Sequence, residues 1–198
     1  HGLAAQIARE LGLSTETVHR LHIGSLLHDV GKFAQRAGEG KSRTWDGAAK
    51  HDYKYQHALL TSDFIEKYLP DQWRKQIAVT ASSHHRPTRR EHYCLALADH
   101  LAAGERADVS DDQNVVQPRQ LLSIFCSIQA DEKTTGRDAY LPLVPLELTP
   151  DINKDSIFPT DPLKDNQVWK AYEAMWQQFC QDAASLRDAH QPDGNLEV

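Results

Sequence analysis

Apolar residues recur every three or four positions through the first half of the chain, which is the spacing that places them on one face of an α-helix. The first such stripe ends at Gly12, and Ser14 is a favourable N-cap for the second, which ends around Gly31. Residues 34–50 are rich in glycine and charge and predict an exposed loop. The last stripe is apolar nearly all round, so we expect that helix to be buried. The pattern predicts five helices, at about residues 4–11, 15–31, 53–68, 71–84 and 91–103.

The second half of the chain is less regular. Residues 121–128 and 140–150 are apolar, and three prolines in the latter exclude a helix and favour an extended edge segment. Helical spacing returns at residues 165–189, whose apolar face needs a surface to pack on. The sequence therefore predicts a mainly α fold: a helical bundle over residues 1–105, and an extension over residues 106–198 that ends in a helix and packs against the bundle.

Composition places the chain among soluble globular proteins. Its 198 residues are 40% apolar and 25% charged. No apolar run approaches the roughly 20 residues of a membrane span, and no segment resembles a signal peptide, so we expect a cytoplasmic protein. The three cysteines lie far apart, which argues against a disulfide framework or a zinc knuckle. A net charge of −6 restricts any contact with nucleic acid to a local basic patch.

Histidine usage points to the chemistry. The chain has 11 histidines, and ten of them fall within residues 1–100. His28 and Asp29 are adjacent at the end of an apolar helix, where a turn lets both side chains point toward one place. A neutral imidazole beside a carboxylate suits a divalent transition metal such as Mn, Fe, Co, Ni or Zn. The other candidate ligands lie near helix ends or on inward faces: His1, His57, His84, His85 and Asp99.

These residues also have interpretations that involve no metal. His84 and His85 could form an ordinary loop pair, and Asp99 could pair with an arginine inside its apolar helix. Lys32 either offsets the dipole at a helix end or contacts a phosphate. The remaining histidines are expected to be surface residues: His19, His22, His51, His92, His100 and His190.

The segment LLHDVGK, with the downstream histidines and aspartate, resembles the HD superfamily of metal-dependent phosphohydrolases. A more specific resemblance runs from about residue 20 to residue 180. GSLLHDVGKFAQRAG, YQHALLTSDFI, SSHHRP and LADHLAAGER are similar, in that order, to the N-terminal part of the large, polymerase-cyclase-like subunit of type III CRISPR effector complexes of the Csm type. The Gly-Gly-Asp-Asp signature of that family's palm domain is absent, so the chain is expected to be an N-terminal portion of such a subunit.

This resemblance implies a metal-dependent nuclease that cuts single-stranded DNA. Its implied partners are that DNA and the other subunits of the ribonucleoprotein complex, with guide RNA and target RNA reached through the complex; no membrane is involved. By motif position, His28 and Asp29 are the HD pair and, with Lys32, the catalytic residues. The later ligands would be His57, His84, His85 and Asp99. In this family the helix of the first ligand usually does not precede the HD pair, whereas the helix at His1 does, so the role of His1 stays open.

The ligand set has room for one or two ions, because Asp29 can bridge two metals with its two oxygens. Such a pair activates a water and neutralises charge on the phosphodiester during in-line attack. A basic run follows the histidine pair and suits backbone phosphates, although a solvated surface face would look the same. The candidate nucleic-acid contacts are Lys32, Arg36, Arg86, Arg89 and Arg90.

Two other functions agree with the same residues. An HD phosphohydrolase acting on a nucleotide or cyclic dinucleotide would have a tight pocket for a small substrate. A non-catalytic assembly module would hold a structural metal whose coordination is completed by protein ligands.

Overall fold

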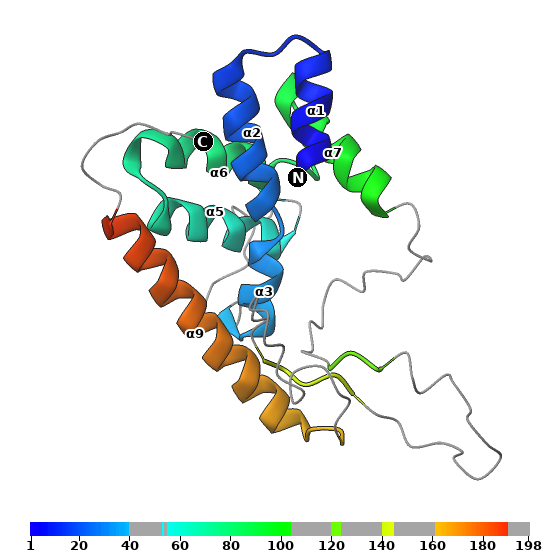
Figure 1. Ribbon diagram of the computed structural model, residues 1–198, viewed down its shortest axis with the longest axis vertical. Coiled ribbons are helices and arrows are strands. Elements are labelled where there is room, and N and C mark those ends of the chain that lie inside the picture. The colour runs from blue at the N-terminus through cyan, green and yellow to red at the C-terminus, as the bar shows by residue number, and fades with distance from the viewer. Residues whose placement is uncertain (40–52, 54, 104–119, 124–139, 145–160, 190–198) are drawn as a thin grey trace, which may run out of the picture.

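A computed structural model describes residues 1–39, 53, 55–103, 120–123, 140–144 and 161–189 (Figure 1). Helices dominate this part of the chain: α1 (Gly2–Glu10), α2 (Thr15–Leu27), α3 (Val30–Arg36), α5 (Gln56–Tyr68), α6 (Asp71–Ser82), α7 (Arg90–Ala103) and α9 (Asp165–Ala189). Within the described ranges there is no sheet, and β structure is limited to one isolated bridge. The mainly α fold with a C-terminal helix is therefore confirmed.

The helices α1 and α2 form a hairpin at one end of the molecule (Figure 1). Gly12 has a φ of 68°, a left-handed conformation that lets the chain reverse after α1. Ser14 then caps α2, because its side-chain oxygen accepts a hydrogen bond from the Thr17 N–H at 3.3 Å. The hairpin packs on α7 through one apolar cluster, whose buried members are Ala4, Ala5, Ala8, Val18, Leu21, Cys94, Leu95 and Ala98.

A second apolar cluster joins α3, α5, α6 and α9. Its buried members are Ala34, Leu60, Phe64, Ile65, Ile77, Ala78, Ala81 and Trp176. The central helix is α5, in which eight of thirteen residues are buried. Three of the eight are polar, and two of these, His57 and Thr61, face the residues that link α2 to α3.

The prediction for the second helix is wrong in one respect, because the helix does not continue to Gly31. α2 ends at Leu27, and a separate short helix, α3, runs from Val30 to Arg36. Gly31 is buried inside α3, where a Cβ atom would lie 1.9 Å from the backbone oxygen of His57. A glycine is thus needed at position 31 because α3 approaches α5 closely there, and not because a helix ends there. The first residues of the predicted 34–50 loop are also helical, and residues 40–50 lie outside the described ranges.

The expectation that the fifth helix is buried nearly all round is also wrong. The face of α7 that packs inward consists of His92, Cys94, Leu95 and Ala98. On the opposite face Tyr93, Leu97 and Leu101 are 58%, 49% and 58% exposed. Apolar composition alone did not distinguish these two faces.

The helix α9 packs against α3 and α5 (Figure 1). Trp176 is 7% exposed and lies in the second apolar cluster, with its ring 5.6 Å from that of Phe64. Next to the start of α9, Leu122 and Tyr140 form the antiparallel bridge, which begins the expected extended segment. The remainder of residues 121–128 and 140–150 lies outside the described ranges. Among the described helices, none combines the length and apolarity needed to cross a membrane.

Candidate metal centre

The HD pair occupies the two-residue link between α2 and α3. His28 is the C-cap of α2, and Asp29 is the N-cap of α3. Thr61 of α5 fixes this link from beneath: its hydroxyl donates to the His28 carbonyl at 2.9 Å and accepts from the Gly31 N–H at 3.0 Å. Thr61 is fully buried, so both bonds are shielded from water and hold the link in one conformation.

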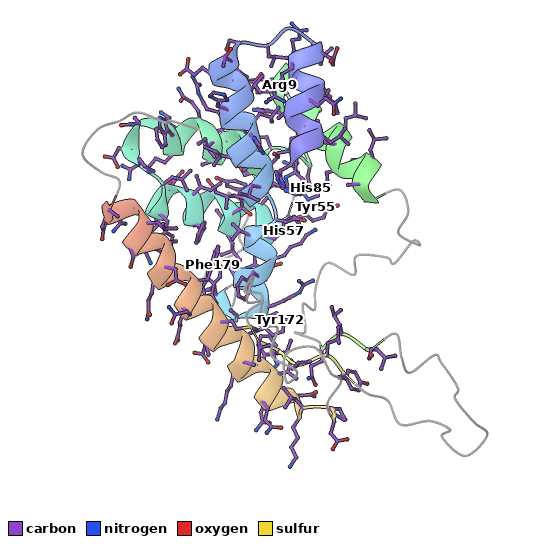
Figure 2. The ribbon with its side chains drawn as sticks, in the orientation of Figure 1. Arg9, Tyr55, His57, His85, Tyr172 and Phe179 are labelled. Atoms are coloured by element: carbon purple, nitrogen blue, oxygen red, sulfur yellow. The ribbon has the colours of Figure 1, made fainter. Side chains whose placement is uncertain are left out.

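Three further helices bring four more candidates to the same place. His57 lies in the first turn of α5, His84 and His85 follow the C-cap of α6, and Asp99 lies on α7. Figure 2 shows His57 and His85 together beneath the end of α2, with Tyr55 beside them. Residues separated by up to 71 positions in the sequence thus meet where α2, α3, α5, α6 and α7 come together.

Among the described residues, two groups of donor atoms are compact enough to hold a metal ion. One consists of His57, His84 and His85, and the other of His28, His84 and Asp99; within each group the donor atoms lie within 4.8 Å of one another. His84 belongs to both groups. Because its Nδ1 is engaged by a backbone carbonyl, only its Nε2 is available as a ligand, so His84 can bind one ion and not two.

Backbone carbonyls orient two of the rings. The Nδ1 atom of His28 lies 2.8 Å from the Ser25 carbonyl, and that of His84 lies 2.7 Å from the Ala81 carbonyl. Each bond places the proton on Nδ1 and leaves the Nε2 lone pair facing the site, which is the arrangement common to metal-binding histidines. Both Nε2 atoms are buried and have no hydrogen-bond partner within the described residues, as is also true of Asp29 Oδ1.

Asp29 lies between the two groups. Its Oδ1 is 3.8 Å from His57 Nε2, and its Oδ2 is 3.5 Å from His28 Nε2 and 2.9 Å from Lys32 Nζ. On the far side of His28, Asp99 Oδ1 lies 3.4 Å from the same Nε2. Asp99 therefore pairs with a histidine, rather than with an arginine as one interpretation of the sequence had it.

The electrostatics keep two histidines neutral. Burial lowers the pKa of His84, and burial together with the neighbouring His84 and His57 lowers the pKa of His85 to about 3. Burial also acts to lower the pKa of His28, but the nearby carboxylates of Asp99 and Asp29, 3.4 and 3.5 Å from its Nε2, outweigh it, so that pKa is raised. The close approach of the His28 ring lowers the pKa of Asp99 to about 2. Neutral imidazoles and ionised carboxylates are the ligand forms of these groups.

The donor set fits a divalent transition metal. Most of the donors are imidazole nitrogens, and one or two are carboxylate oxygens. Such a set suits Mn, Fe, Co, Ni and Zn, whereas Mg and Ca prefer oxygen donors. The buried Nε2 atoms of His28 and His84 form no hydrogen bond within the described residues, and they supply an independent indication because buried polar atoms usually form one.

The other predicted residues are exposed. His1 is exposed and belongs to neither donor group; its ring stacks on that of His22 with centroids 5.2 Å apart. Its role as a ligand stays a prediction. Arg36, Arg86 and Arg89 are exposed. Arg90 is exposed too, but its guanidinium donates to the Leu11 carbonyl at 3.1 Å and so closes the α1–α2 turn.

One histidine expected at the surface is buried. His92 is 2% exposed, and its Nδ1 accepts from the Thr88 N–H at 3.4 Å. The surface interpretation failed because the periodicity of an almost wholly apolar helix does not indicate which face a histidine occupies.

Two residues that shape the site were not identified from the sequence. One is Thr61. Its position as a polar residue within the apolar run of α5 is the sequence feature that could have identified it. The other is Tyr55, whose ring stacks on His57 at 5.4 Å and meets His85 edge-on at 4.4 Å. No local pattern marks Tyr55, because its contact with His85 depends on how α6 ends.

Comparison with known proteins gives two matches. The family model described as HD domain matches residues 2–104. The chain is also 30% identical over 156 residues to a protein of Methanocaldococcus jannaschii named CRISPR system single-strand-specific deoxyribonuclease Cas10/Csm1 (subtype III-A). That match covers 73% of this chain and 19% of the relative, so the chain spans about a fifth of the relative's length. No solved structure matches the chain. Both matches confirm the resemblance expected from the sequence.

Proposed function

The chain belongs to the HD domain family, whose members are metal-dependent phosphohydrolases, and from this membership we propose that it hydrolyses phosphodiester bonds in single-stranded DNA as part of a type III CRISPR effector complex. The observation that carries the proposal is the convergence of four histidines and two aspartates, with the buried Nε2 atoms of His28 and His84 aimed into the site. The single-stranded specificity and the complex are supported by the name of the archaeal relative.

The ligand groups assign roles to the chain's own residues. His57, His84 and His85 would hold one ion, and His28 and Asp99 would hold a second, with one oxygen of Asp29 directed to each side. A divalent transition metal bound there lowers the pKa of a bound water and neutralises charge on the phosphodiester. The Ser25 and Ala81 carbonyls keep the rings oriented, so little reorganisation is needed.

The cationic residues around the centre would bind the DNA backbone. Lys32 lies on α3 beside Asp29, Arg36 follows one turn later, and Arg86 and Arg89 follow the histidine pair. Because the chain carries a net charge of −6, binding depends on this local patch and should weaken steeply with added salt.

A direct test compares substrates and variants. The purified chain, loaded in turn with Mn, Co and Ni, is incubated with single-stranded DNA, duplex DNA, RNA and a cyclic dinucleotide. We expect cleavage of single-stranded DNA, which Asp29→Asn abolishes and His100→Gln, a change at an exposed histidine of α7, leaves intact. Hydrolysis of the cyclic dinucleotide alone would favour a small-molecule phosphohydrolase. A folded, metal-loaded chain that cleaves none of the substrates would favour a structural metal.

A further inference from the structure

The two carboxylate oxygens of Asp29 have different neighbours. Oδ1 is buried, lies 3.8 Å from His57 Nε2, and has no hydrogen-bond partner within the described part of the chain. Oδ2 lies 3.5 Å from His28 Nε2 and forms a salt bridge to the ammonium of Lys32 at 2.9 Å. One oxygen thus faces the three-histidine group, and the other faces the His28–Asp99 group with a cation already beside it.

This asymmetry makes the two metal positions unequal. An ion held by the three-histidine group can use an oxygen that no ammonium holds. An ion held by His28 and Asp99 must share Oδ2 with the positive charge of Lys32, and like charges at one oxygen repel each other. The second position should therefore bind metal more weakly than the first.

Lys32 is well placed to leave that oxygen. Its backbone is fixed because α3 packs closely on α5 at Gly31, but its side chain is a flexible four-carbon stem and is 31% exposed. Movement of the ammonium away from Asp29 needs only side-chain rotation and brings the charge toward solvent at the rim of the site. An ammonium is also a good partner for a phosphate.

We propose that Lys32 couples metal binding to nucleic-acid binding: an ion entering the His28–Asp99 group displaces the Lys32 ammonium from Asp29 Oδ2, and the displaced ammonium binds a backbone phosphate of the substrate. This inference rests on the proposed function and specifies how that same site is regulated. By linkage, nucleic acid that engages Lys32 also strengthens metal binding at the second position.

The first measurement is metal binding without nucleic acid. Mn²⁺ is titrated calorimetrically into the wild type, Lys32→Gln, and Arg36→Gln, which removes an exposed cation one turn further along α3. Lys32→Gln should tighten the weaker Mn²⁺ position by about 5-fold or more, which is the lower end of typical coupling between sites. Arg36→Gln should leave both positions unchanged. An unchanged or weakened second position in Lys32→Gln would overturn the competition.

The second measurement uses a phosphorothioate-linked oligothymidylate, which resists cleavage, and records the salt dependence of binding with and without saturating Mn²⁺. Lys32→Gln should flatten the log–log slope relative to the wild type by roughly 0.7 in the presence of Mn²⁺, the value for one phosphate contact on a single strand. Without Mn²⁺ the two proteins should share one slope. Arg36→Gln should change the slope equally under both conditions. An equal deficit for Lys32→Gln under both conditions, or a deficit under neither, contradicts the proposal.

Two features keep the outcome interpretable. Lys32→Arg keeps the charge and should retain the wild-type difference between the two metal positions, which separates loss of charge from a folding defect. Neither measurement records cleavage, so a chain that fails to cut DNA can still show the coupling. Conversely, an active nuclease whose Lys32→Gln variant shows no change refutes only this inference.

Discussion

His57 and His85 face each other through their Nε2 atoms at 2.9 Å, so one ring must donate its N–H to the other. Tyr55 contacts both rings: it stacks on His57 and meets His85 edge-on. The hydrogen bond uses the same two nitrogens that the three-histidine group offers to a metal. Metal binding at this group therefore requires that proton to move from Nε2 to Nδ1 of its own ring, a tautomeric change that leaves the imidazole neutral.

The lowered pKa of His85 predicts how stability depends on pH in the presence of a chelator. An unfolded imidazole takes up a proton near pH 6.5, whereas folded His85 does so only near pH 3. Protons therefore favour the unfolded chain within this window, and the free energy of unfolding should fall as pH falls from 6.5 toward 3. Urea unfolding at several pH values measures the trend, and His85→Gln should reduce its steepness. A curve identical to that of the wild type would contradict the prediction.

Removal of the HD pair should abolish metal-dependent cleavage. Asp29→Ala should cost more than His28→Ala, because Asp29 directs one oxygen to each donor group, whereas His28 belongs to one group. We expect the rate to fall by more than ~100-fold in both variants, since loss of even the groups that orient metal ligands costs about 10- to 100-fold. Metal content by mass spectrometry should fall in parallel. Near-normal cleavage by Asp29→Ala would refute a bridging role for this carboxylate.

A methyl group at Gly31 should disrupt the site from a position that offers no ligand. A Cβ there would lie 1.9 Å from the His57 carbonyl oxygen, so α3 must move away from α5 and carry Asp29 with it. Gly31→Ala should destabilise the fold by roughly 1–3 kcal/mol, as overpacking does, and weaken metal binding. Gly24→Ala is the matched control, because a Cβ at this helical glycine has its nearest contact at an ordinary 3.6 Å. Equal melting temperatures for the two variants would show that α3 and α5 can move apart without loss of stability.

Much of the helical fold could be predicted from the sequence, because one apolar face per helix is a local signal. The helix α3 was missed since it has only seven residues and its buried glycine looks like a helix end. The candidate metal ligands were visible as histidines and aspartates near helix ends or inside apolar segments. Their orientation was not, because the carbonyls of Ser25 and Ala81 act through the backbone, which leaves no mark in the sequence.

The arginines near the histidine pair should differ in their effect on DNA binding. Arg86→Gln and Arg89→Gln should each flatten the salt dependence by roughly 0.7 of a log–log unit, while metal content stays constant. Arg90→Gln should change the slope less and instead lower stability by about 1 kcal/mol, because its guanidinium holds the Leu11 carbonyl. Anisotropy titrations and thermal melts decide between these outcomes. If all three variants changed the slope equally and none lost stability, Arg90 would belong with Arg86 and Arg89 among the proposed DNA contacts.

The C-terminal helix should stabilise the bundle without taking part in the chemistry. Trp176 is 7% exposed and packs against Phe33 and Phe64, so Trp176→Ala should destabilise the fold by about 3–5 kcal/mol. Phe179 is 36% exposed, and Phe179→Ala should cost roughly 1–2 kcal/mol. Since α9 supplies no atom to either donor group, both variants should keep the metal content and the cleavage rate per folded molecule. Chemical unfolding and single-turnover rates at a temperature where both remain folded provide the measurement. A folded Trp176→Ala protein that binds less metal would show that α9 supports the site through α3, the helix whose N-cap is Asp29.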